Sequence, residues 1–407
     1  MGAGLRGQGY ARRAVEGGAA RLAAVAEPDP QRRARFAAQF RIPADRTYAS
    51  WAELAADGRV ADAAVVATPD RLHTGPAVAL AGLGYHLLLE KPMAPTEEEA
   101  GAIVDAVERN KVIFALCHVL RYTGYTHTVK ALIDEGRIGR IVSVQHLEPV
   151  GWWHQAHSFV RGEWRNSGEA TPMLLAKACH DIDWLMYVVG QPVRRVSSFG
   201  GLAHFRPDQR PAGAADRCLD CPLEPTCPYS APRLYLGCLG DPEKEFWPLS
   251  AVTADHTEAG VRAALRTGRY GRCVYASDND AVDHQVTSIE FADGATASFT
   301  MTAFTPFEQR KTRIFGTHGY LDGDGVRLRL VDFVTGREEV VEPPAGSAYS
   351  IEAGHADGDH ALVDAFLAAV AANDASLLNS DATTSLASHR TVWAAERARA
   401  NGTVVTL

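Results

Sequence analysis

The chain has 407 residues, too many for one ordinary hydrophobic core, so we expect two domains. It carries 41 basic and 49 acidic residues and no basic stripe, which excludes nucleic acid as a partner. The sequence shows no secretion signal and no apolar run of membrane-spanning length, so we expect a soluble cytoplasmic protein without a membrane partner. Its seven cysteines then favour free thiols or metal ligands over disulfides.

A glycine-rich turn opens the chain and runs into a predicted helix, Tyr10 to Gly17. The pattern is G-x-G-x-x-G, which allows a tight turn, close approach of the backbone to a pyrophosphate, and close helix-to-strand packing. We predict cofactor contacts at Gly2, Gly4, Leu5, Arg6 and Gly7. A dinucleotide-binding sheet needs a buried strand before such a turn, yet only Met1 precedes it. We expect either a start further upstream or a poorly stable sheet without its central strand.

A second predicted strand, Leu22 to Ala26, ends at Glu27. A carboxylate about 20 residues past the glycines accepts hydrogen bonds from an adenine ribose and repels a 2′-phosphate, which favours NAD over NADP. Arg32 and Arg33 lie just beyond and weaken that preference. The structural alternative for Glu27 is a charge at a helix N-terminus.

The loop after a third predicted strand, Ala63 to Ala67, lies where cofactors meet the carboxyl ends of parallel strands. We predict cofactor contacts from Thr68, Pro69, Asp70 and His73. The alternative role of Thr68 or Asp70 is to cap the following helix.

A fourth strand, Leu87 to Leu89, ends at Glu90 and Lys91, and we place both residues at the cofactor site. Pro92 keeps the Lys91 backbone extended, which sends the lysine side chain past the carboxyl end of the strand. An amine held beside an apolar floor and a cofactor can have a lowered pKa, which suits it to take the proton of a substrate hydroxyl. The alternative is a surface lysine in a strand-to-helix turn.

A helix from Thr96 to Asn110 and a strand from Val112 to Cys117 continue the alternation. Strands that alternate with helices predict a doubly wound α/β domain. We place this domain at residues 1–122 and a second domain at residues 123–407.

Four motifs in this order resemble the glucose-fructose oxidoreductase and inositol dehydrogenase superfamily (Gfo/Idh/MocA). They are Gly2-x-Gly-x-x-Gly7, Val66-Ala-Thr-Pro-Asp70 with His73, Glu90-Lys-Pro92 and His180-Asp-Ile-Asp183. The resemblance implies an N-terminal Rossmann domain, a C-terminal α/β domain with an open, mostly antiparallel sheet, and a bound nicotinamide cofactor. It also implies oxidation of sugar or polyol hydroxyls, with Lys91 facing the substrate, and assembly into homodimers or homotetramers.

An aromatic and donor-rich segment follows the first domain. Aromatic faces and forked donors suit a sugar ring or an anionic group on it. We predict substrate contacts from Arg121, Tyr122, Trp153, His154, His157, Arg161, Trp164, Arg165 and, further on, Asp183. The alternative for any one of these residues is packing in a loop at a subunit contact.

Thr171 to Val189 is predicted as a helix that carries Lys177 and His180 on one face. The superfamily usually has an aspartate four residues before this histidine, and Ala176 stands there instead. We therefore predict that Lys177 and His180 assist Lys91 in catalysis, with Asp183 available to orient the histidine. The alternative is a histidine satisfied within the core.

A cysteine-containing insertion occupies about residues 206–280. Three of its thiols are close in sequence and a fourth comes from afar, which fits a closed tetrahedral structural zinc site. The predicted ligands are Cys218, Cys221, Cys227 and Cys273, with Cys238 as the rival for the fourth position. Reduced thiols that pack, a redox pair, and an iron–sulphur cluster are the alternatives.

The rest of the chain predicts further strands, including Thr287 to Phe291 and Ala295 to Phe304, and two helices, Ala361 to Ala372 and Thr384 to Ala400. His284 and His355 are open candidates for the pocket.

The predicted chemistry is the oxidation of a sugar ring hydroxyl, in which Lys91 takes the proton, His180 or Lys177 assists, and NAD accepts the hydride. If the ketone leaves, the protein is an ordinary sugar or polyol dehydrogenase. If the ketone stays, it acidifies the neighbouring C–H, the anomeric substituent is eliminated, water adds and the hydride returns. That is a redox-neutral glycosidase, and it accommodates a neutral or an anionic glycoside, such as a sulphonated one. A non-catalytic NAD-binding sensor is the remaining alternative.

Overall fold

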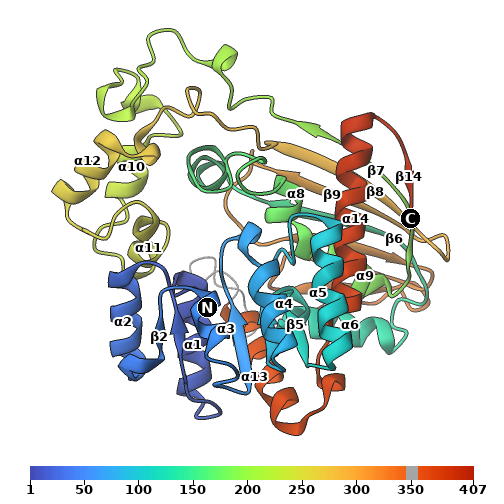
Figure 1. Cartoon of the computed structure of the whole chain (residues 1–407). Helices are drawn as coiled ribbons and strands as arrows, with labels where there is room; N and C mark the ends of the chain where they lie inside the picture. The colour runs from blue at the N-terminus through green and yellow to red at the C-terminus, as the bar shows by residue number, and fades with distance from the viewer. Residues whose placement is uncertain (345–355) are drawn as a thin grey trace.

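The computed structural model describes residues 1–344 and 356–407, which form two parts (Figure 1). The N-terminal part has a parallel sheet between helices, and the C-terminal part has a large sheet with helices on one face. This architecture confirms the predicted fold class. No described helix is both long and apolar enough to cross a membrane.

Short apolar runs build the N-terminal sheet. Its described strands are β1 (Val25–Ala26), β2 (Thr47–Tyr48), β3 (Ala63–Val66), β4 (His86–Leu89) and β5 (Phe114–Leu116). β1 pairs with β2, and β3, β4 and β5 pair in that order, all parallel. Leu87 and Leu89 pack into one helix layer and Leu88 into the other. This buries β4 on both faces, as its unbroken apolar sequence predicts.

Met1 lies between the two parts of this sheet. Its ammonium group donates to the carbonyl of Val65 at 2.6 Å, and its carbonyl accepts from the N–H of Ala67 at 2.9 Å. The N–H of Gly2 donates to the carbonyl of Ala26 at 3.0 Å. Met1 and Gly2 therefore join β1 to β3 at the place where the glycine-rich turn predicts a central strand before it.

Helices cover both faces of the N-terminal sheet: α1 (Leu5–Glu16), α2 (Pro30–Phe40), α3 (Trp51–Ala56), α4 (Thr74–Gly82) and α5 (Glu97–Asn110). The hydroxyl of Thr96 caps α5 by accepting from the N–H of Glu99 at 3.2 Å. α13 (Ala356–Ala372), from the far end of the chain, packs into the same layer as α1. Its buried Leu362, Val363 and Phe366 complete that layer.

In the described residues, the C-terminal sheet has nine strands in the order β13-β12-β11-β10-β6-β9-β8-β7-β14. The strands are β6 (Ile141–Pro149), β7 (Val193–Gly201), β8 (His284–Phe291), β9 (Thr296–Thr302), β10 (Lys311–Gly316), β11 (Gly319–Gly323), β12 (Leu328–Asp332), β13 (Glu338–Val341) and β14 (Val405–Thr406). Of the described pairs, β6 and β9 run parallel and the others antiparallel.

One face of this sheet is covered by helices and the other is exposed. The covering helices include α6 (Gly124–Asp134), α8 (Met173–Ala176), α9 (Cys179–Val189) and α14 (Ala382–Asn401). Burial alternates along β8, so its exposed residues share one face with those of β7. On that face Phe199 is 68% exposed and its cross-strand neighbour Val286 is 40% exposed.

The predicted single helix from Thr171 to Val189 is wrong, because the structure has two helices there. α8 ends at Ala176 and α9 begins at Cys179. Between them, the backbone of Ala178 turns to φ −110° and ψ 12°, outside the helical range. Lys177 therefore lies at a helix junction and not on a continuous helix face.

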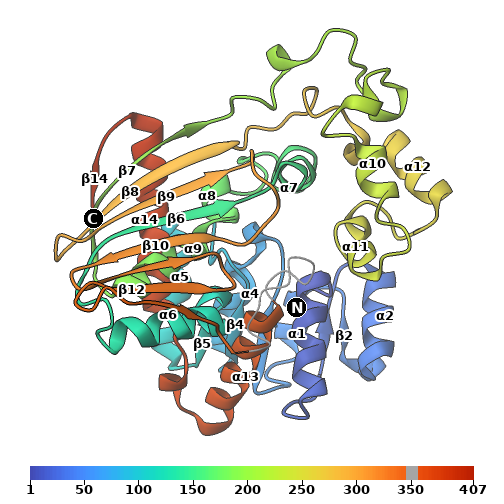
Figure 2. The same cartoon turned by 180° about the vertical axis from the view of Figure 1, so that it is seen from behind.

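The insertion forms a lobe of its own, at the same end of the molecule as α1 and α2 (Figure 2). It contains α10 (Ala231–Leu236), α11 (Pro242–Phe246) and α12 (Glu258–Thr267). A small core around Tyr235 of α10 and Val261 and Leu265 of α12 holds these two helices together. The lobe packs against α7 (Trp152–His154) and η4 (Gln155–Arg161), a π-helical turn that follows α7.

Candidate active site

A cavity of about 260 Å³ lies between the carboxyl end of β4 and the C-terminal domain, and we call it the inner cavity. Both domains and the insertion lobe contribute to its wall. Its lining residues are Arg6, Lys91, Glu148, His154, Ser158, Phe159, Trp164, Ala176, Lys177, His180, Trp247, Phe307, Glu308, Gln309 and Arg310. Ligands of open α/β sheets bind at this end of the strands, so the inner cavity is the candidate active site.

Lys91 supplies a cation to the inner cavity from the N-terminal domain. Its side chain reaches the C-terminal domain, where Nζ donates to the carbonyl of Ala176 at 2.6 Å. Ala176 occupies the position at which the superfamily usually has an aspartate. In this chain a backbone carbonyl therefore holds the lysine at the junction of α8 and α9.

Glu90, supported by Arg6, holds the backbone of Lys91 in place. Glu90 accepts the Lys91 N–H at 2.9 Å through Oε2, and its Oε1 accepts from Arg6 and from the hydroxyl of Tyr10. Burial alone would raise the pKa of Glu90, but the Arg6 guanidinium holds that pKa below its usual range. Arg6 also forms a bidentate pair with Asp359 of α13, at 2.6 and 2.7 Å. Glu90 thus positions Lys91 and stays ionised.

A chain of alternating charges runs from the inner cavity to the C-terminal sheet. Lys177 Nζ lies 3.0 Å from Glu148 Oε1, and Arg310 lies 2.9 Å from Glu148 Oε2. Arg310 also pairs with Asp181, whose Oδ1 lies 3.0 Å from Nε2 of His146. Burial lowers the pKa of Lys177 below its ordinary value of 10.5, against the opposing effect of Glu148. A lysine with a lowered pKa exchanges protons more readily near neutral pH.

Two histidines line the same cavity. Burial, together with the charge of Lys177, lowers the pKa of His154 well below 6.5, so its ring is neutral. Nδ1 of His154 donates to the carbonyl of Val150 at 3.2 Å, which leaves the lone pair on Nε2. His180 is buried on the first turn of α9. The inner cavity therefore gathers two amines and two imidazoles, a set suited to proton transfer.

The residues at the glycine-rich turn fit a dinucleotide. A Cβ on Gly2, whose φ is +80°, would lie 2.3 Å from the carbonyl oxygen of Ala67, and one on Gly7 would lie 2.0 Å from the carbonyl oxygen of Gly2. Gly4 faces open space, and α1 starts at Leu5 with no side-chain cap and no acidic residue in its first turn. Its N-terminal N–H groups are therefore available to a pyrophosphate.

Glu27 lies at the end of β1, beside the glycine-rich turn. Oε2 accepts the N–H of Ala3 at 2.8 Å, and Oε1 accepts the N–H of Asp29 at 3.0 Å. Arg32 lies 3.4 Å from Oε1, and Arg33 donates to the Glu27 carbonyl. A carboxylate has about four acceptor sites, so these contacts leave room for a ribose hydroxyl. The predicted ribose contact stays a prediction.

The loop between β3 and α4 is held by backbone contacts. Nε2 of His73 lies 2.8 Å from the carbonyl of Thr68, and Nδ1 lies 2.7 Å from the carbonyl of Pro92. His73 therefore joins this loop to the turn after Lys91. Because both of its ring nitrogens contact backbone carbonyls, its role is to position the loop and not, as was predicted, to contact the cofactor. Asp70 accepts from the indole N–H of Trp164 at 3.2 Å, which joins the loop to the C-terminal domain.

Three predicted substrate-binding residues lie away from the inner cavity, at the joint between the domains. Arg121 forms a bidentate pair with Asp183 at 2.6 and 2.8 Å, and Nδ1 of His118 lies 2.7 Å from the same carboxylate. The hydroxyl of Tyr122 lies 3.0 Å from that of Ser380. Asp183 is thus committed to Arg121 and His118, and the expected pairing with His180 is corrected.

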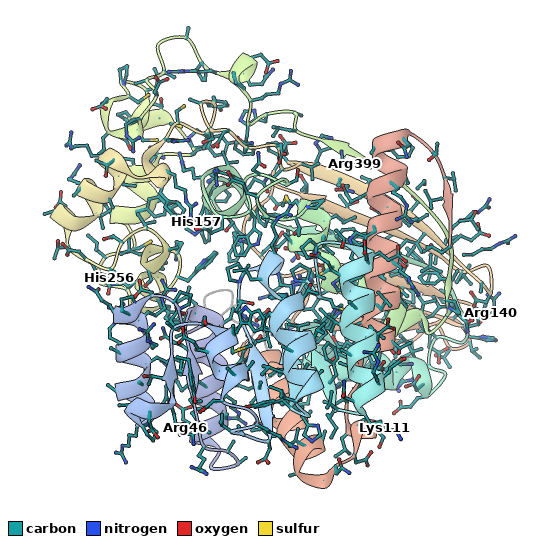
Figure 3. All side chains as sticks on the ribbon, in the orientation of Figure 1. Arg46, Lys111, Arg140, His157, His256 and Arg399 are labelled. Atoms are coloured by element: carbon teal, nitrogen blue, oxygen red, sulfur yellow. The ribbon has the colours of Figure 1, made fainter. Side chains whose placement is uncertain are left out.

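Other members of the aromatic segment hold the insertion lobe. Nδ1 of His157 lies 2.9 Å from the hydroxyl of Tyr235, where η4 meets the lobe (Figure 3), and burial lowers the pKa of His157 to about 3. Arg161 is buried and donates to backbone carbonyls of the insertion. Arg165 pairs with Asp278. These three residues do not line the inner cavity, so their predicted substrate contacts are corrected to structural ones.

Of the predicted substrate-binding residues, His154 and Trp164 line the inner cavity, and Trp153 lies just outside it. His284 lies on β8 next to Asp283, and His355 lies outside the described residues. Several lining residues were not predicted from the sequence: Glu148, Ser158, Phe159, Trp247, Phe307, Glu308, Gln309 and Arg310. Glu148 could have been predicted, because it lies two residues after His146 and therefore on the same face of the strand.

The four predicted zinc ligands line one cavity of about 200 Å³ in the insertion. Arg161 lies beside them, 3.5 Å from Sγ of Cys218. In residues 1–344 and 356–407, however, no three cysteine, histidine or acidic side chains are placed so that they could hold a metal ion. The predicted zinc site at Cys218, Cys221, Cys227 and Cys273 is therefore not supported. Cys238 lies elsewhere and donates to the carbonyl of Leu234.

Curated relatives match parts of the chain. YteT of Bacillus subtilis (strain 168), an oxidoreductase by name, is 26% identical over 272 residues, which cover 65% of this chain and 60% of that protein. Levoglucosan dehydrogenase of Pseudarthrobacter phenanthrenivorans is 30% identical over 41% of this chain and 42% of that protein. A 2,7-anhydro-N-acetylneuraminate hydratase of Escherichia coli (strain K12) is 30% identical over 37% of this chain and 39% of that protein. The matched region thus spans less than two thirds of each of these relatives.

Solved structures share the fold over the whole chain. A levoglucosan dehydrogenase in complex with NADH and levoglucosan has a TM-score of 0.71 at 20% identity, covering 100% of this chain and 97% of that one. The model of an oxidoreductase family with an NAD-binding Rossmann fold matches residues 1–118. The model of the C-terminal α/β domain of the same family matches residues 130–407. The chain therefore belongs to the Gfo/Idh/MocA family of oxidoreductases.

Proposed function

We propose that this protein is an NAD-dependent oxidoreductase that acts on a ring hydroxyl of a sugar or glycoside. The observation that carries the proposal is the position of Lys91, whose amine projects from the carboxyl end of β4 into a cavity closed by the C-terminal domain. Relatives named levoglucosan dehydrogenase and 2,7-anhydro-N-acetylneuraminate hydratase support a sugar as the substrate.

The residues of the inner cavity have separable roles in this chemistry. NAD, when bound, supplies the hydride acceptor. Lys91 takes the hydroxyl proton, and its hydrogen bond to the Ala176 carbonyl holds Nζ in place. Lys177 and His180 lie in the same cavity and orient the hydroxyl or pass on its proton. Glu90 and Arg6 keep the backbone of Lys91 in position.

The second candidate is redox-neutral cleavage of a glycoside, and one observation favours it. An alcohol oxidation needs one base. Besides Lys91, the inner cavity contains the neutral His154, whose Nε2 carries a lone pair, and Lys177, whose pKa is lowered. A second base removes the C–H proton that a ring ketone acidifies, and an acid protonates the leaving oxygen. Cations in the cavity also suit an anionic glycoside, for example a sulphonated one. A hydratase among the relatives is consistent with chemistry that adds water.

A substrate screen separates these candidates. The purified protein is incubated with NAD and a panel of sugars, polyols and aryl glycosides, and both NADH absorbance and aglycone release are recorded. NADH formation supports the dehydrogenase, and aglycone release without net NADH supports the redox-neutral glycosidase. Binding of NAD with no turnover of any sugar, polyol or glycoside would instead support the non-catalytic sensor.

Replacement of Lys91 tests the catalytic assignment. Lys91→Ala should lower kcat by about 10²–10⁴-fold, the usual contribution of a general base. Lys130→Ala, which removes an exposed helix lysine paired with Asp134, is the matched control and should retain activity. Full activity of Lys91→Ala would contradict the proposal.

We further propose assembly into a homodimer or homotetramer through the exposed face of the C-terminal sheet. Phe199 and Val286 are cross-strand neighbours on that face, and exposed apolar neighbours of this kind mark contact surfaces. Light scattering should give the mass of a dimer or tetramer, and Phe199→Asp should lower it. A monomeric wild-type protein would contradict this assembly. The cytoplasmic location expected from the sequence stays a prediction.

A further inference from the structure

A second cavity, of about 800 Å³, adjoins the inner cavity, and we call it the outer cavity. Trp247 and Phe307 line both cavities, so the two share a wall. The volume of the outer cavity falls within the roughly 300–1,000 Å³ typical of small-molecule sites. A ligand that occupies the inner cavity can therefore extend past Trp247 into a space large enough for another ring.

The shared wall is built from aromatic rings that meet at tilted and edge-to-face angles. The centroid of Trp153 lies 5.4 Å from that of Trp247 and 4.9 Å from that of Phe307. Trp247 also meets His154 of the inner cavity edge-on at 5.2 Å. Such contacts fix the ring planes, so the outer cavity presents preformed aromatic faces. Trp152, the first residue of α7, is 39% exposed and also lines the outer cavity.

The polar groups of the outer cavity carry both signs of charge. Arg233 and Lys244 contribute cations and Glu243 contributes an anion. The hydroxyl of Tyr229 adds a neutral donor and acceptor. Lys244 is paired with Asp241 at 2.7 Å, and Arg233 donates to the carbonyls of Glu224 and Pro225, so both cations already have partners. Aromatic faces with mixed donors and acceptors therefore suit a neutral sugar ring better than a phosphate, a sulphonate or a fatty chain.

The insertion lobe supplies much of this cavity. Trp247 follows α11 directly, and Arg233 lies on α10, whereas Trp153 lies on α7, outside the insertion. The lobe has its own small core and is fastened by His157 and Arg161, so its wall is rigidly placed beside the inner cavity.

We propose that the outer cavity binds the neutral sugar ring joined to the reacting sugar, so that the substrate is a di- or oligosaccharide and not a free monosaccharide. This inference rests on the proposed action at a sugar hydroxyl in the inner cavity. It assigns to the insertion a role in substrate choice. It also explains why three indoles gather at a position where the nucleotide-binding turn plays no part.

Kinetic comparison of matched sugars tests the proposal. The panel consists of neutral disaccharides of glucose, galactose, mannose, rhamnose and xylose, each paired with the methyl glycoside of its non-reducing sugar. For the sugar that reacts, kcat/KM should be at least about 10-fold higher for the disaccharide, the effect of one or two added ring contacts. Equal kcat/KM values within a pair would overturn the proposal.

Variants separate the outer cavity from the catalytic groups. Trp152→Ala and Trp153→Ala should each raise KM for the disaccharide roughly 10-fold while kcat stays within twofold, and should narrow the gap to the methyl glycoside. Trp51→Ala, which removes a 36%-exposed indole from α3 in the N-terminal domain, is the control. A rise in KM that is the same for both members of a pair would contradict a separate subsite.

Binding without turnover distinguishes failure of this inference from failure of the proposed function. Calorimetric titration of the same panel into the NAD-saturated protein measures affinity whether or not a reaction follows. If disaccharides bind in a way that depends on Trp152 and Trp153 but are not oxidised, the outer cavity is a sugar-binding site and the proposed oxidoreductase function is refuted. Absence of binding by every disaccharide, or loss of the binding signal because NAD itself occupies the outer cavity, would overturn the inference.

Discussion

The pair of Arg121 and Asp183 provides a sharp test, because sequence and structure assign it different roles. As substrate-binding residues, they would affect KM and leave stability unchanged. In the structure both side chains are at most 5% exposed and are joined by two hydrogen bonds of 2.6 and 2.8 Å. Burial alone would raise the pKa of Asp183, but Arg121 and His118 hold it far below its ordinary value. The carboxylate is therefore charged and depends on its partners.

Arg121→Met removes the main partner and leaves Asp183 buried beside His118. Breaking a buried ion pair on one side costs about 3–5 kcal/mol. With an unfolding entropy of roughly 2 cal/mol/K per residue, each kcal/mol corresponds to about 1 °C in a chain of this length. We expect Tm to fall by about 3–5 °C, measured by differential scanning fluorimetry, with KM for the substrate unchanged.

Two further variants make this result interpretable. Arg13→Met breaks a pair with Asp364 whose side chains are 33% and 48% exposed, so it should cost no more than about 1 kcal/mol. Replacing Arg121 by Met and Asp183 by Leu together removes the stranded charge and should recover part of the lost stability. A Tm change for Arg121→Met no larger than that for Arg13→Met, or a rise in KM at unchanged Tm, would refute the structural role.

Three more outcomes are expected. Gly7→Ala places a Cβ 2.0 Å from a backbone oxygen, so it should lower Tm and abolish NAD binding. Gly4→Ala places its Cβ in open space, so it should leave Tm unchanged and weaken NAD binding, measured by fluorescence titration. Equal effects of the two variants on Tm would contradict this prediction. Burial lowers the pKa of His389 to about 3, so the folded protein keeps this ring neutral while the unfolded chain protonates it below pH 6.5. The free energy of unfolding should therefore be lower by about 1.4 kcal/mol at pH 5.5 than well above pH 6.5. His389→Phe should flatten the dependence of Tm on pH between pH 7.5 and 5.5, and an unchanged slope would count against this role. Glu148→Gln removes the carboxylate that raises the pKa of Lys177, so the acidic limb of the pH–rate profile should move to lower pH, and a shift to higher pH would exclude the assigned pairing.

Local patterns predicted the backbone geometry around the N-terminal half of the candidate site. The glycine spacing, the apolar strand before Lys91 and the proline after it act over a few residues, so their geometry follows from the sequence alone. Leu87 to Leu89 form the buried parallel strand that their unbroken apolar run indicates. The position of Lys91 at its end needed no information from the rest of the chain.

The C-terminal half depends on contacts that the sequence does not reveal. Arg121 and Asp183 are 62 positions apart, and their pairing is decided by how α9 packs on the N-terminal domain. Arg310 reaches Glu148 only because β10 lies beside β6 in the sheet. Trp247 enters the site from an insertion whose fold has no sequence periodicity to predict it. A residue type can thus suggest a ligand, while strand order determines whether it meets one.

The return of α13 to the N-terminal layer has a consequence for dissecting this protein. Leu362, Val363 and Phe366 fill the space beside Tyr10 of α1, and Asp359 neutralises Arg6 at the start of the same helix. A recombinant fragment that stops at residue 122 lacks α13. The apolar surface that α13 covers would then be exposed to water, and Arg6 would keep Glu90 as an acidic partner but lose Asp359. Expression of the nucleotide-binding half by itself should therefore yield aggregates, and a soluble version would need residues 356–372 supplied in trans or grafted by a linker.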